Sequence, residues 1–562
     1  MVRDKSRGLF KRHVERLKSS LEAHGHDTIC RFLTTHTKLK GRPFSFAGHE
    51  YQKRILEDLS RDIVIVKSAQ LGISEMSVRL ALAKSALING FSTIYTMPSA
   101  MGAQNFMRTR VDPIIQSSAY LSDMIHKTTD NTSIKRFGES YLYMKGAQVD
   151  SQAISVPADL LINDEVNNSN QAVLTLFESR LIHSEYGLTV KLSTPTIPNY
   201  GIDAAYKQSR RYVNMCKCCH CNEWFYPEYH DHAVIPGYKG SIGDVSKGQF
   251  ADPDFRWQES FIACPKCGLR ADLQPEFREW VCENPGDGFV AAGYRVSPFD
   301  CPSTVSVGDI VKSSTTYERR QDFYNQRLGI SLEDAESTFL EEELRGALIS
   351  EYAGGCYNFV AGLDMGKTCW LTVAGVKPDQ SLVIVHTEGI PLFRVAERMQ
   401  EITRQFKLRM TVVDSLPYTE TVYRMQQDNQ NLFAAIYSNS KNIELFKIRD
   451  KEEDAERGVN DLRQVNIAKH RMFDHIMLEV RSGRVKKVSD GNDGAWIEHL
   501  QDQKRVKEFI LEELQFVWTK TAGVDHLHHS LLYAFVASRL TGMITRGGVP
   551  LPCLVNPFRL KN

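Results

Sequence analysis

The segment Asp62–Leu82, DIVIVKSAQLGISEMSVRLAL, decides how the first half of the chain folds. Its β-branched run IVIV is typical of a strand buried in a parallel sheet. Residues 75–86 carry apolar side chains at helical spacing, and the small-residue loop Ser68–Ser74 joins the two. A helix that begins directly after a strand offers free N–H groups and a positive dipole end to an anion. The segment therefore predicts a phosphate-binding loop.

This loop departs from the usual phosphate-loop pattern. In G-x-x-x-x-G-K-[ST] loops a lysine precedes the final hydroxyl residue, but here Ile73 stands at that place. Lys67, at the end of the strand, can supply the cation instead. Ser74 occupies the place of the hydroxyl that binds Mg²⁺. Taken alone, the loop leaves an ordinary strand-to-helix turn open as the alternative.

Three further segments favour a nucleotide site. The apolar run 160–163 ends in two acids, Asp164 and Glu165, and acids just beyond a buried strand are costly unless they bind something. In phosphate-loop ATPases such acids hold Mg²⁺ and polarise the attacking water. Lys191–Thr196 is another strand end, where hydroxyl residues and a proline follow. Upstream, Phe44–Gln52 offers an aromatic residue and an amide at the place where helicase-like ATPases hold adenine.

The order of these segments along the chain resembles that in the large subunits of tailed-phage terminases. Within that family, the chain resembles the lambda-type branch. That branch has an early lysine in a K-S-A-x-x-G-x-S pattern, which Lys67–Ser74 matches position by position. The resemblance implies an ASCE-type P-loop ATPase with a parallel sheet, in which Asp164 binds the metal and Glu165 is the catalytic carboxylate. The implied ATP-binding residues are Lys67, Ser68, Ala69, Gln70, Leu71, Gly72, Ile73, Ser74, Gln52 and Asp164, and the implied coupling residues are Ser193, Thr194 and Thr196. An arginine finger is expected among Arg79, Arg108, Arg110 and Arg180, and the sequence does not choose among them.

Two C-x-x-C pairs lie in the middle of the chain. Four thiolates in this arrangement predict a zinc ribbon with a closed, structural Zn²⁺ site. The favoured ligands are Cys218, Cys221, Cys264 and Cys267. Cys216 and Cys219 form an equally spaced pair, and His220, His230 or His232 could also replace a ligand.

The second half has the element order of a ribonuclease H-like domain. Strand-like runs at 358–366, 370–376 and 381–388 are followed by a helical run at 393–406 and a strand that ends in Asp414. Asp364 lies on the first of these strands. In this fold the first and fourth strands are neighbours, so the two carboxylates would repel each other unless divalent cations lay between them. Two such cations activate water for phosphodiester cleavage.

A late helix is expected to supply the third acid. Terminase nucleases resemble this region, with Asp-His near the start of the last helix, which here is Asp525-His526. The resemblance implies that Asp364, Asp414 and Asp525 hold Mg²⁺ or Mn²⁺, with His529 one helical turn on as a supporting residue. A separate metal site of His526, His528 and His529 is disfavoured, because these positions point in different directions on a helix.

Bulk composition limits the other possibilities. A chain of 562 residues predicts several domains, and a net charge of +1 confines any DNA-binding surface to a local patch. Twelve cysteines without a secretory leader favour a reducing compartment, and no apolar run is long enough to span a membrane. The predicted divisions are an N-terminal basic helical segment (1–43), the ATPase core (44–212), the zinc-ribbon insertion (213–300), a helical linker (301–351), the nuclease (352–541) and a C-terminal tail (542–562).

The resemblance thus implies a motor that uses ATP to drive double-stranded DNA into procapsids and a metal-dependent endonuclease that cuts concatemers. The implied partners are DNA, a terminase small subunit, the portal protein and further copies in a ring, in the host cytoplasm. One alternative is a non-enzymatic zinc-ribbon DNA-binding protein with degenerate ATPase and nuclease folds. The other is a transposase or integrase with an accessory ATPase, which usually places Glu where this chain has Asp525.

Overall fold

The computed structural model describes residues 28–154, 156–286, 288–333, 337–438, 440, 443–449, 463–510, 513–521 and 523–543. Residues 1–27 of the predicted basic segment (1–43) and residues 544–562 of the predicted tail (542–562) lie outside the described residues. The chain divides into two compact units, Met1–Glu333 with Lys507–Gln515 and Asp334–Val506 with Phe516–Asn562. No helix in the described residues combines the length and the apolar character that crossing a bilayer requires.

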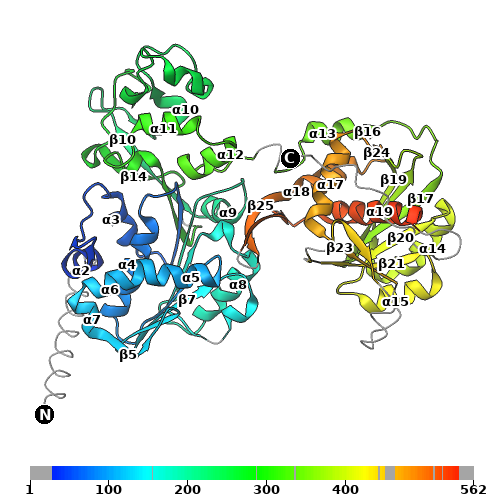
Figure 1. Cartoon of the computed structure of the whole chain (residues 1–562), viewed down its shortest axis with the longest axis horizontal. Helices are drawn as coiled ribbons and strands as arrows, with labels where there is room; N and C mark the ends of the chain where they lie inside the picture. The colour runs from blue at the N-terminus through cyan, green and yellow to red at the C-terminus, as the bar shows by residue number, and fades with distance from the viewer. Residues whose placement is uncertain are drawn as a thin grey trace. The chain divides into compact units, whose positions relative to one another are not determined.

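The first unit is built on a largely parallel sheet (Figure 1). Its parallel strands run in the order β10 (Arg210–Lys217), β15 (Ala291–Val296), β3 (Asp62–Lys67), β9 (Leu188–Ser193), β8 (Leu160–Asp164), β4 (Ser92–Met97) and β7 (Ser140–Gly146). Antiparallel strands complete the edges: β11 (Trp224–Phe225) and β14 (Arg278–Cys282) beside β10, and β6 (Ile134–Phe137) and β5 (Ile125–Asp130) beyond β7. This arrangement places the carboxyl ends of β3, β9 and β8 side by side.

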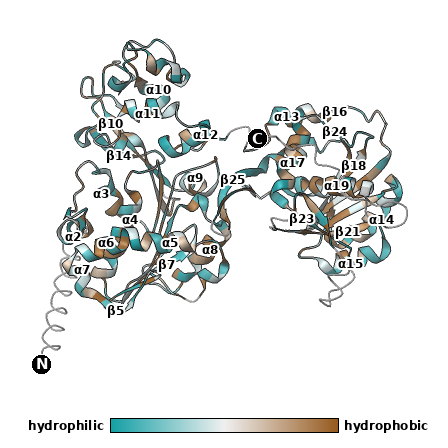
Figure 2. Cartoon of the chain, in the orientation of Figure 1, coloured by the Kyte–Doolittle hydropathy of each residue, from teal (hydrophilic) through white to brown (hydrophobic). Residues whose placement is uncertain are grey.

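Helices cover both faces of this sheet. Ile63 and Ile65 of β3 pack on one face, and Val64 and Val66 pack on the other. The first face is covered by α2 (Thr28–His36), α3 (Tyr51–Leu56), α4 (Ile73–Leu87), α5 (Ala100–Phe106), α6 (Asp112–Ser117) and α7 (Ala119–Met124), and the second by α8 (Gln171–Glu178) and α9 (Gly201–Lys207). Burial on both sides explains why β3 and β8 are continuous apolar runs. Figure 2 shows the hydrophobic residues gathered on the strands.

A separate small core lies between β10 and β15 in the sequence. It includes α10 (Tyr229–His232), β12 (Ala233–Val234) and β13 (Phe261–Ile262). Later segments join this core, namely α11 (Val307–Ser314) and the π-helix η11 (Phe323–Leu328). The insertion therefore packs with the segment that follows the sheet.

The second unit contains a mixed sheet. Its strand order is β16 (Leu348–Ile349), β24 (Val485–Val488), β19 (Leu382–Pro391), β18 (Thr368–Val376), β17 (Asn358–Asp364), β20 (Met410–Asp414), β21 (Leu432–Tyr437), β23 (Gln464–Ile467) and β22 (Phe446–Ile448). Strand β17 is antiparallel to β18 and parallel to β20, with Leu363 opposite Val413. The predicted adjacency of the first and fourth strands is therefore confirmed.

Helices also cover both faces of the second sheet. One face carries α14 (Val395–Phe406) and α15 (Thr419–Asp428), and the other carries α13 (Glu341–Ala347), α17 (Lys469–Arg481), α18 (Asp493–Asp502) and α19 (His526–Met543). A hairpin of β25 (Gln503–Ile510) and β26 (Glu513–Lys520) precedes α19. Helix α19 lies so close to β17 that a Cβ atom at Gly362 would overlap the Ser530 carbonyl oxygen and the Ala534 nitrogen. This contact brings the start of α19 to the end of β17.

Candidate active sites

The loop between β3 and α4 forms a compact turn around Gly72. Gly72 has φ +73° and Gln70 has φ +63°, so two residues of this turn adopt left-handed conformations. A Cβ atom at Gly72 would lie 3.0 Å from Nε2 of Gln52. Ile73 is fully buried in the core beneath α4, which explains why the lysine of the usual pattern is absent there. Lys67, at the end of β3, is the lysine of this loop.

The acids after β8 meet the loop. Nζ of Lys67 lies 2.9 Å from Oε1 of Glu165. The hydroxyl of Tyr95 donates to Oδ2 of the buried Asp164 at 2.7 Å, and the nearby Ser74 hydroxyl acts to lower the pKa of this carboxylate. Two strands separated only by β9 thus bring together a lysine, two carboxylates and a hydroxyl.

The charges at this site affect one another. Burial lowers the pKa of Lys67, but the charges of Glu165 and Asp164 outweigh burial and raise that pKa above its usual value. Burial raises the pKa of Asp164, and the charge of Lys67 opposes this rise only in part. A buried carboxylate of this kind is stabilised by a bound cation, so the residues fit a Mg²⁺ ion coordinated between Ser74 and Asp164.

Two of the predicted coupling residues contact Asn167, which follows the acid pair in the sequence. Its backbone N–H donates to Oγ of Ser193 at 3.2 Å, and its Nδ2 donates to Oγ1 of Thr196 at 2.7 Å. The Ser193 hydroxyl donates to the carbonyl of Thr194 at 3.0 Å. Asn167 comes two residues after Glu165, and it was not predicted, because no spacing rule singles out an asparagine at that place.

The four candidate arginines have different environments. Arg79 is fully buried, lies 2.8 Å from Glu75, and stacks over the ring of Phe44 at 4.1 Å. Its position therefore has a structural explanation. Arg110 is 59% exposed on a π-helix at Met107–Val111, and Arg108 is exposed on the same turn. The guanidinium of Arg180 donates to the hydroxyl of Ser179.

The predicted cysteines come together in the insertion. The sulfur atoms of Cys218, Cys221, Cys264 and Cys267 all lie within 4.8 Å of one another. Cys216 belongs to β10, is fully buried, and donates to the carbonyl of Asp272 at 3.3 Å. Cys219 is exposed and lies outside the cluster. Four convergent thiols with two short spacings fit a tetrahedral Zn²⁺ ion.

The two strand-borne acids of the second unit are neighbours. Asp364 ends β17 and Asp414 ends β20, in adjacent parallel strands. Burial raises the pKa of Asp414 to about 6, and the charge of Asp364 contributes to the rise. Asp525 directly precedes α19 and accepts the N–H groups of His528 and His529 on its backbone carbonyl.

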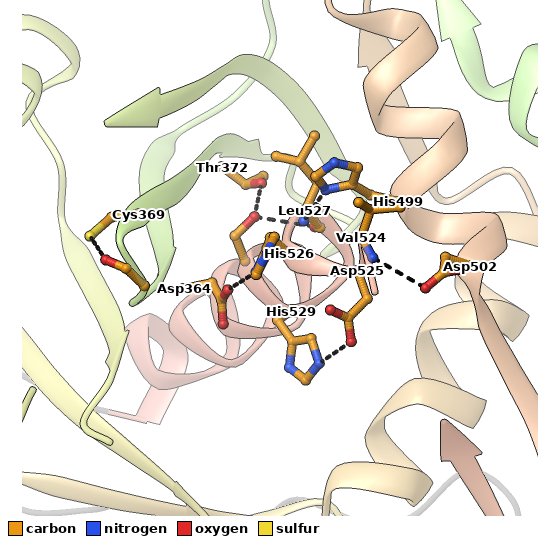
Figure 3. Close-up of polar contacts among 12 residues, drawn as sticks. Asp364, Cys369, Thr372, His499, Asp502, Val524, Asp525, His526, Leu527 and His529 are labelled. Atoms are coloured by element: carbon orange, nitrogen blue, oxygen red, sulfur yellow. Dashed lines mark hydrogen bonds and ion pairs between the residues drawn. The ribbon is translucent and has the colours of Figure 1, made fainter. Parts of the chain in front are cut away.

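Histidines of α19 hold two of these three carboxylates, as Figure 3 shows. Nδ1 of His526 lies 2.8 Å from Oδ2 of Asp364. Nε2 of His529 lies 3.1 Å from Oδ2 of Asp525, and Gln503 donates to the same oxygen. Although burial opposes it, the hydrogen bond from His529 holds the pKa of Asp525 below its usual value.

The three acids are close but not gathered around one point. Within the described residues, only the four cysteines bring three or more potential ligand atoms within 4.8 Å of one another. The sequence placed His526 in the Asp-His motif and disfavoured it as part of a separate metal site, and in the structure it contacts Asp364. His528 is fully buried among Phe339, Phe473 and Trp518, so the three histidines do not share one site.

Comparison with known proteins gives matches along most of the chain. Residues 48–276 match the family model of the phage terminase large subunit gpA, ATPase domain. The large terminase subunit of Escherichia phage lambda is 24% identical over 346 residues, which are 55% of this chain and 52% of that protein. The chain therefore spans about half the length of the curated relative it matches.

Solved structures that match are also phage terminases. The large terminase of bacteriophage HK97 is 13% identical with a TM-score of 0.47, covering 90% of this chain and 98% of that one. The ATPase domain of the Thermus phage P74-26 large terminase is 14% identical with a TM-score of 0.30, covering 52% of this chain and 98% of that one.

Proposed function

Since residues 48–276 belong to the ATPase-domain family of phage terminase large subunits, as the sequence predicted, we propose that this chain is a DNA-packaging enzyme with two activities. The first unit hydrolyses ATP to move double-stranded viral DNA into a procapsid. The second unit is a ribonuclease H-like endonuclease that cuts concatemeric DNA. The small subunit, the portal protein and further copies in a ring are the proposed partners, in the host cytoplasm.

The contact between Lys67 and Glu165 carries the ATPase proposal. These residues are 98 positions apart, yet they lie 2.9 Å from each other at the carboxyl ends of β3 and β8. Ligands of open α/β sheets bind at this edge. The site combines a cation for phosphates, an oxygen pair for Mg²⁺ and a second carboxylate, which are the parts that ATP hydrolysis needs.

Each residue then has a defined task. Lys67 binds the phosphates, while Ser74 and Asp164 would hold a Mg²⁺ ion, which when bound would neutralise charge on the phosphate oxygens. Glu165 orients the attacking water and accepts its proton. Asn167 lies two residues after Glu165, so a shift of Glu165 when the terminal phosphate is lost would move Asn167. Its two hydrogen bonds would pass that movement to Ser193 and Thr196.

DNA-stimulated ATP hydrolysis tests this proposal. Lys67→Ala and Glu165→Gln are expected to lower kcat at least a hundredfold, since they remove the phosphate cation and the general base. Lys207→Ala and Glu178→Gln are matched controls, because both side chains are half-exposed in surface ion pairs. If wild type and all variants are equally inert, the non-enzymatic DNA-binding alternative is favoured instead.

The neighbouring carboxylates carry the nuclease proposal. Asp364, Asp414 and Asp525 would hold two Mg²⁺ or Mn²⁺ ions, which activate water and stabilise the leaving oxygen. The raised pKa of Asp414 beside Asp364 supports this, because two adjacent carboxylates favour a bound cation. His526 and His529 orient Asp364 and Asp525.

Cleavage of plasmid DNA with Mg²⁺ or Mn²⁺ tests the nuclease. Asp364→Asn is expected to abolish cleavage while ATP turnover stays within about twofold, because the two sites lie in different units. Asp379→Asn, on an exposed turn of the same unit, is the control. Loss of both activities in Asp364→Asn would contradict the division of labour, and strand transfer instead of cleavage would favour the transposase alternative.

A further inference from the structure

The π-helix η11 and the glycine after it touch the phosphate loop directly. The backbone N–H of Ala69 donates to the carbonyl of Gln326 at 2.8 Å. Gly329 has φ +67°, and a Cβ atom there would lie only 2.8 Å from the Ser68 nitrogen. A side chain at this glycine would therefore push the loop away. Segment 323–329 forms a wall of the proposed nucleotide site.

The same segment is fixed on its other sides. Phe323 and Leu328 pack in the core of the insertion. Three residues after Gly329, the N–H of Leu332 donates to the carbonyl of Thr196, one of the predicted coupling residues, at 3.1 Å. Single π-helical turns occur often at functional sites. The backbone of η11 is therefore held in a defined position relative to both the phosphate loop and the segment Ser193–Thr196 that carries the coupling residues.

The charge balance at the site calls for another cation. Lys67 faces two carboxylates, Glu165 and Asp164. The buried Arg79 is already paired with Glu75. A nucleoside triphosphate that binds here stays anionic even with Mg²⁺, and phosphate sites of this kind use an arginine in addition to the lysine. Lys67 alone, whose charge is shared with two carboxylates, is insufficient to balance the negative charge of the bound triphosphate.

Arg327 is the available cation. It follows Gln326 on η11 and is half-buried, and its Nε atom is enclosed without a hydrogen-bond partner. Other arginines with an enclosed Nε, such as Arg278 and Arg211, form ion pairs through the same guanidinium. Within the described part of the chain, Arg327 has no ion pair or hydrogen bond at any nitrogen of its guanidinium. A guanidinium left this way favours an anionic ligand.

We propose that Arg327 binds the phosphates of ATP in the same chain, opposite Lys67. The proposal rests on the ATP site proposed above and adds a phosphate ligand from outside the sheet. The helix that carries Arg327 touches the phosphate loop and is followed by Leu332, which bonds to Thr196. A movement of Arg327 on loss of the terminal phosphate would therefore be transmitted to the insertion and to the coupling residues. Guanidinium groups suit this role, since they contact phosphate oxygens through two parallel hydrogen bonds.

Steady-state ATP hydrolysis and nucleotide affinity of the full chain test this proposal. Arg327→Ala is expected to lower kcat/KM for ATP by about tenfold to a hundredfold, and Arg327→Lys to recover part of it. Arg320→Ala is the matched control, because Arg320 is exposed on the preceding turn and contacts the Tyr324 hydroxyl. Thermal melting with and without a non-hydrolysable ATP analogue provides a readout that a purely structural role would not move. The analogue should raise Tm in wild type and Arg320→Ala, and less in Arg327→Ala.

The outcomes separate the two proposals. If Lys67→Ala abolishes turnover and Arg327→Ala retains the wild-type kcat, KM and analogue-induced Tm shift, the role of Arg327 is refuted and the ATPase stands. If the wild-type chain neither hydrolyses ATP nor gains stability from the analogue, both proposals fail. Should Arg327→Ala melt at a lower Tm without nucleotide, the preference of that variant for ATP over ADP decides, since an undiminished wild-type preference would also overturn the role.

Discussion

Nδ1 of His526 lies 2.8 Å from Oδ2 of Asp364, although one residue begins the last described helix and the other ends strand β17, 162 positions earlier. The ring of His526 also stacks parallel to Trp370, with an interplanar angle of 5°. The histidine is thus held between an aromatic surface and a carboxylate. Such a contact sets the direction in which Asp364 presents its free oxygen.

His526→Ala is therefore expected to raise the Mn²⁺ concentration needed for half-maximal DNA cleavage by about tenfold to a hundredfold, because Asp364 loses its orienting partner. A metal titration of plasmid cleavage measures this. His386→Ala is the control, since His386 pairs with Glu388 and not with any of the three proposed metal ligands. An unchanged titration curve would show that His526 does not orient the metal ligands.

Asp414 makes the nuclease unit sensitive to pH. Burial and the neighbouring Asp364 raise its pKa from 3.8 to about 6. Between these values the folded state binds more protons than the unfolded state, so this group lowers stability as pH rises through the window. Asp414→Asn is expected to stabilise the unit at pH 8 by at most about 3 kcal/mol and to have little effect at pH 4. Thermal melting at the two pH values measures the difference.

The same titration affects metal binding. Below about pH 6, protons compete with the cation for Asp414, so the metal requirement for cleavage should rise as pH falls. Half-maximal metal concentrations at pH 5, 6, 7 and 8 give the profile. A flat profile would mean that Asp414 is not a ligand.

The cysteine cluster should hold one zinc ion that stabilises the insertion. Cys264→Ser is expected to lose the metal and to lower the Tm of the first unit, because Cys264 is both a proposed ligand and part of the insertion core. Cys219→Ser should keep the metal, since its sulfur lies outside the cluster. Elemental analysis of the purified variants measures bound zinc, and equal zinc content in both would contradict the assignment.

The close packing of α19 on β17 depends on Gly362. Gly362→Ala places a methyl group against the Ser530 carbonyl and the Ala534 nitrogen, and is expected to destabilise the second unit by about 3 kcal/mol. Gly346→Ala, on α13, adds the same methyl group where nothing lies within 4 Å, and should stabilise by about 0.5 kcal/mol. Urea unfolding followed by tryptophan fluorescence compares them, and equal losses would contradict the packing argument.

The local chemistry of this protein follows from its sequence alone. The strand–loop–helix around Lys67, the acids after Leu160–Asn163 and the paired cysteines are short-range patterns, and each has a direct physical reason in hydrophobic periodicity or ligand spacing. The order of strands and helices after Asn358 was enough to place Asp364 beside Asp414, because that topology leaves few alternatives. These predictions agree with the sheet order of both units.

Only the tertiary structure decided which residues support these groups. Tyr95 reaches Asp164 across 69 positions, and His526 reaches Asp364 across 162. Contacts of this kind depend on how whole strands and helices pack, and no periodic signal marks them in the chain. The sequence already favoured Cys218 over Cys216, and the structure adds the physical reason: Cys216 lies within β10 with its sulfur buried against Asp272, while Cys218 follows the strand and turns toward its partners.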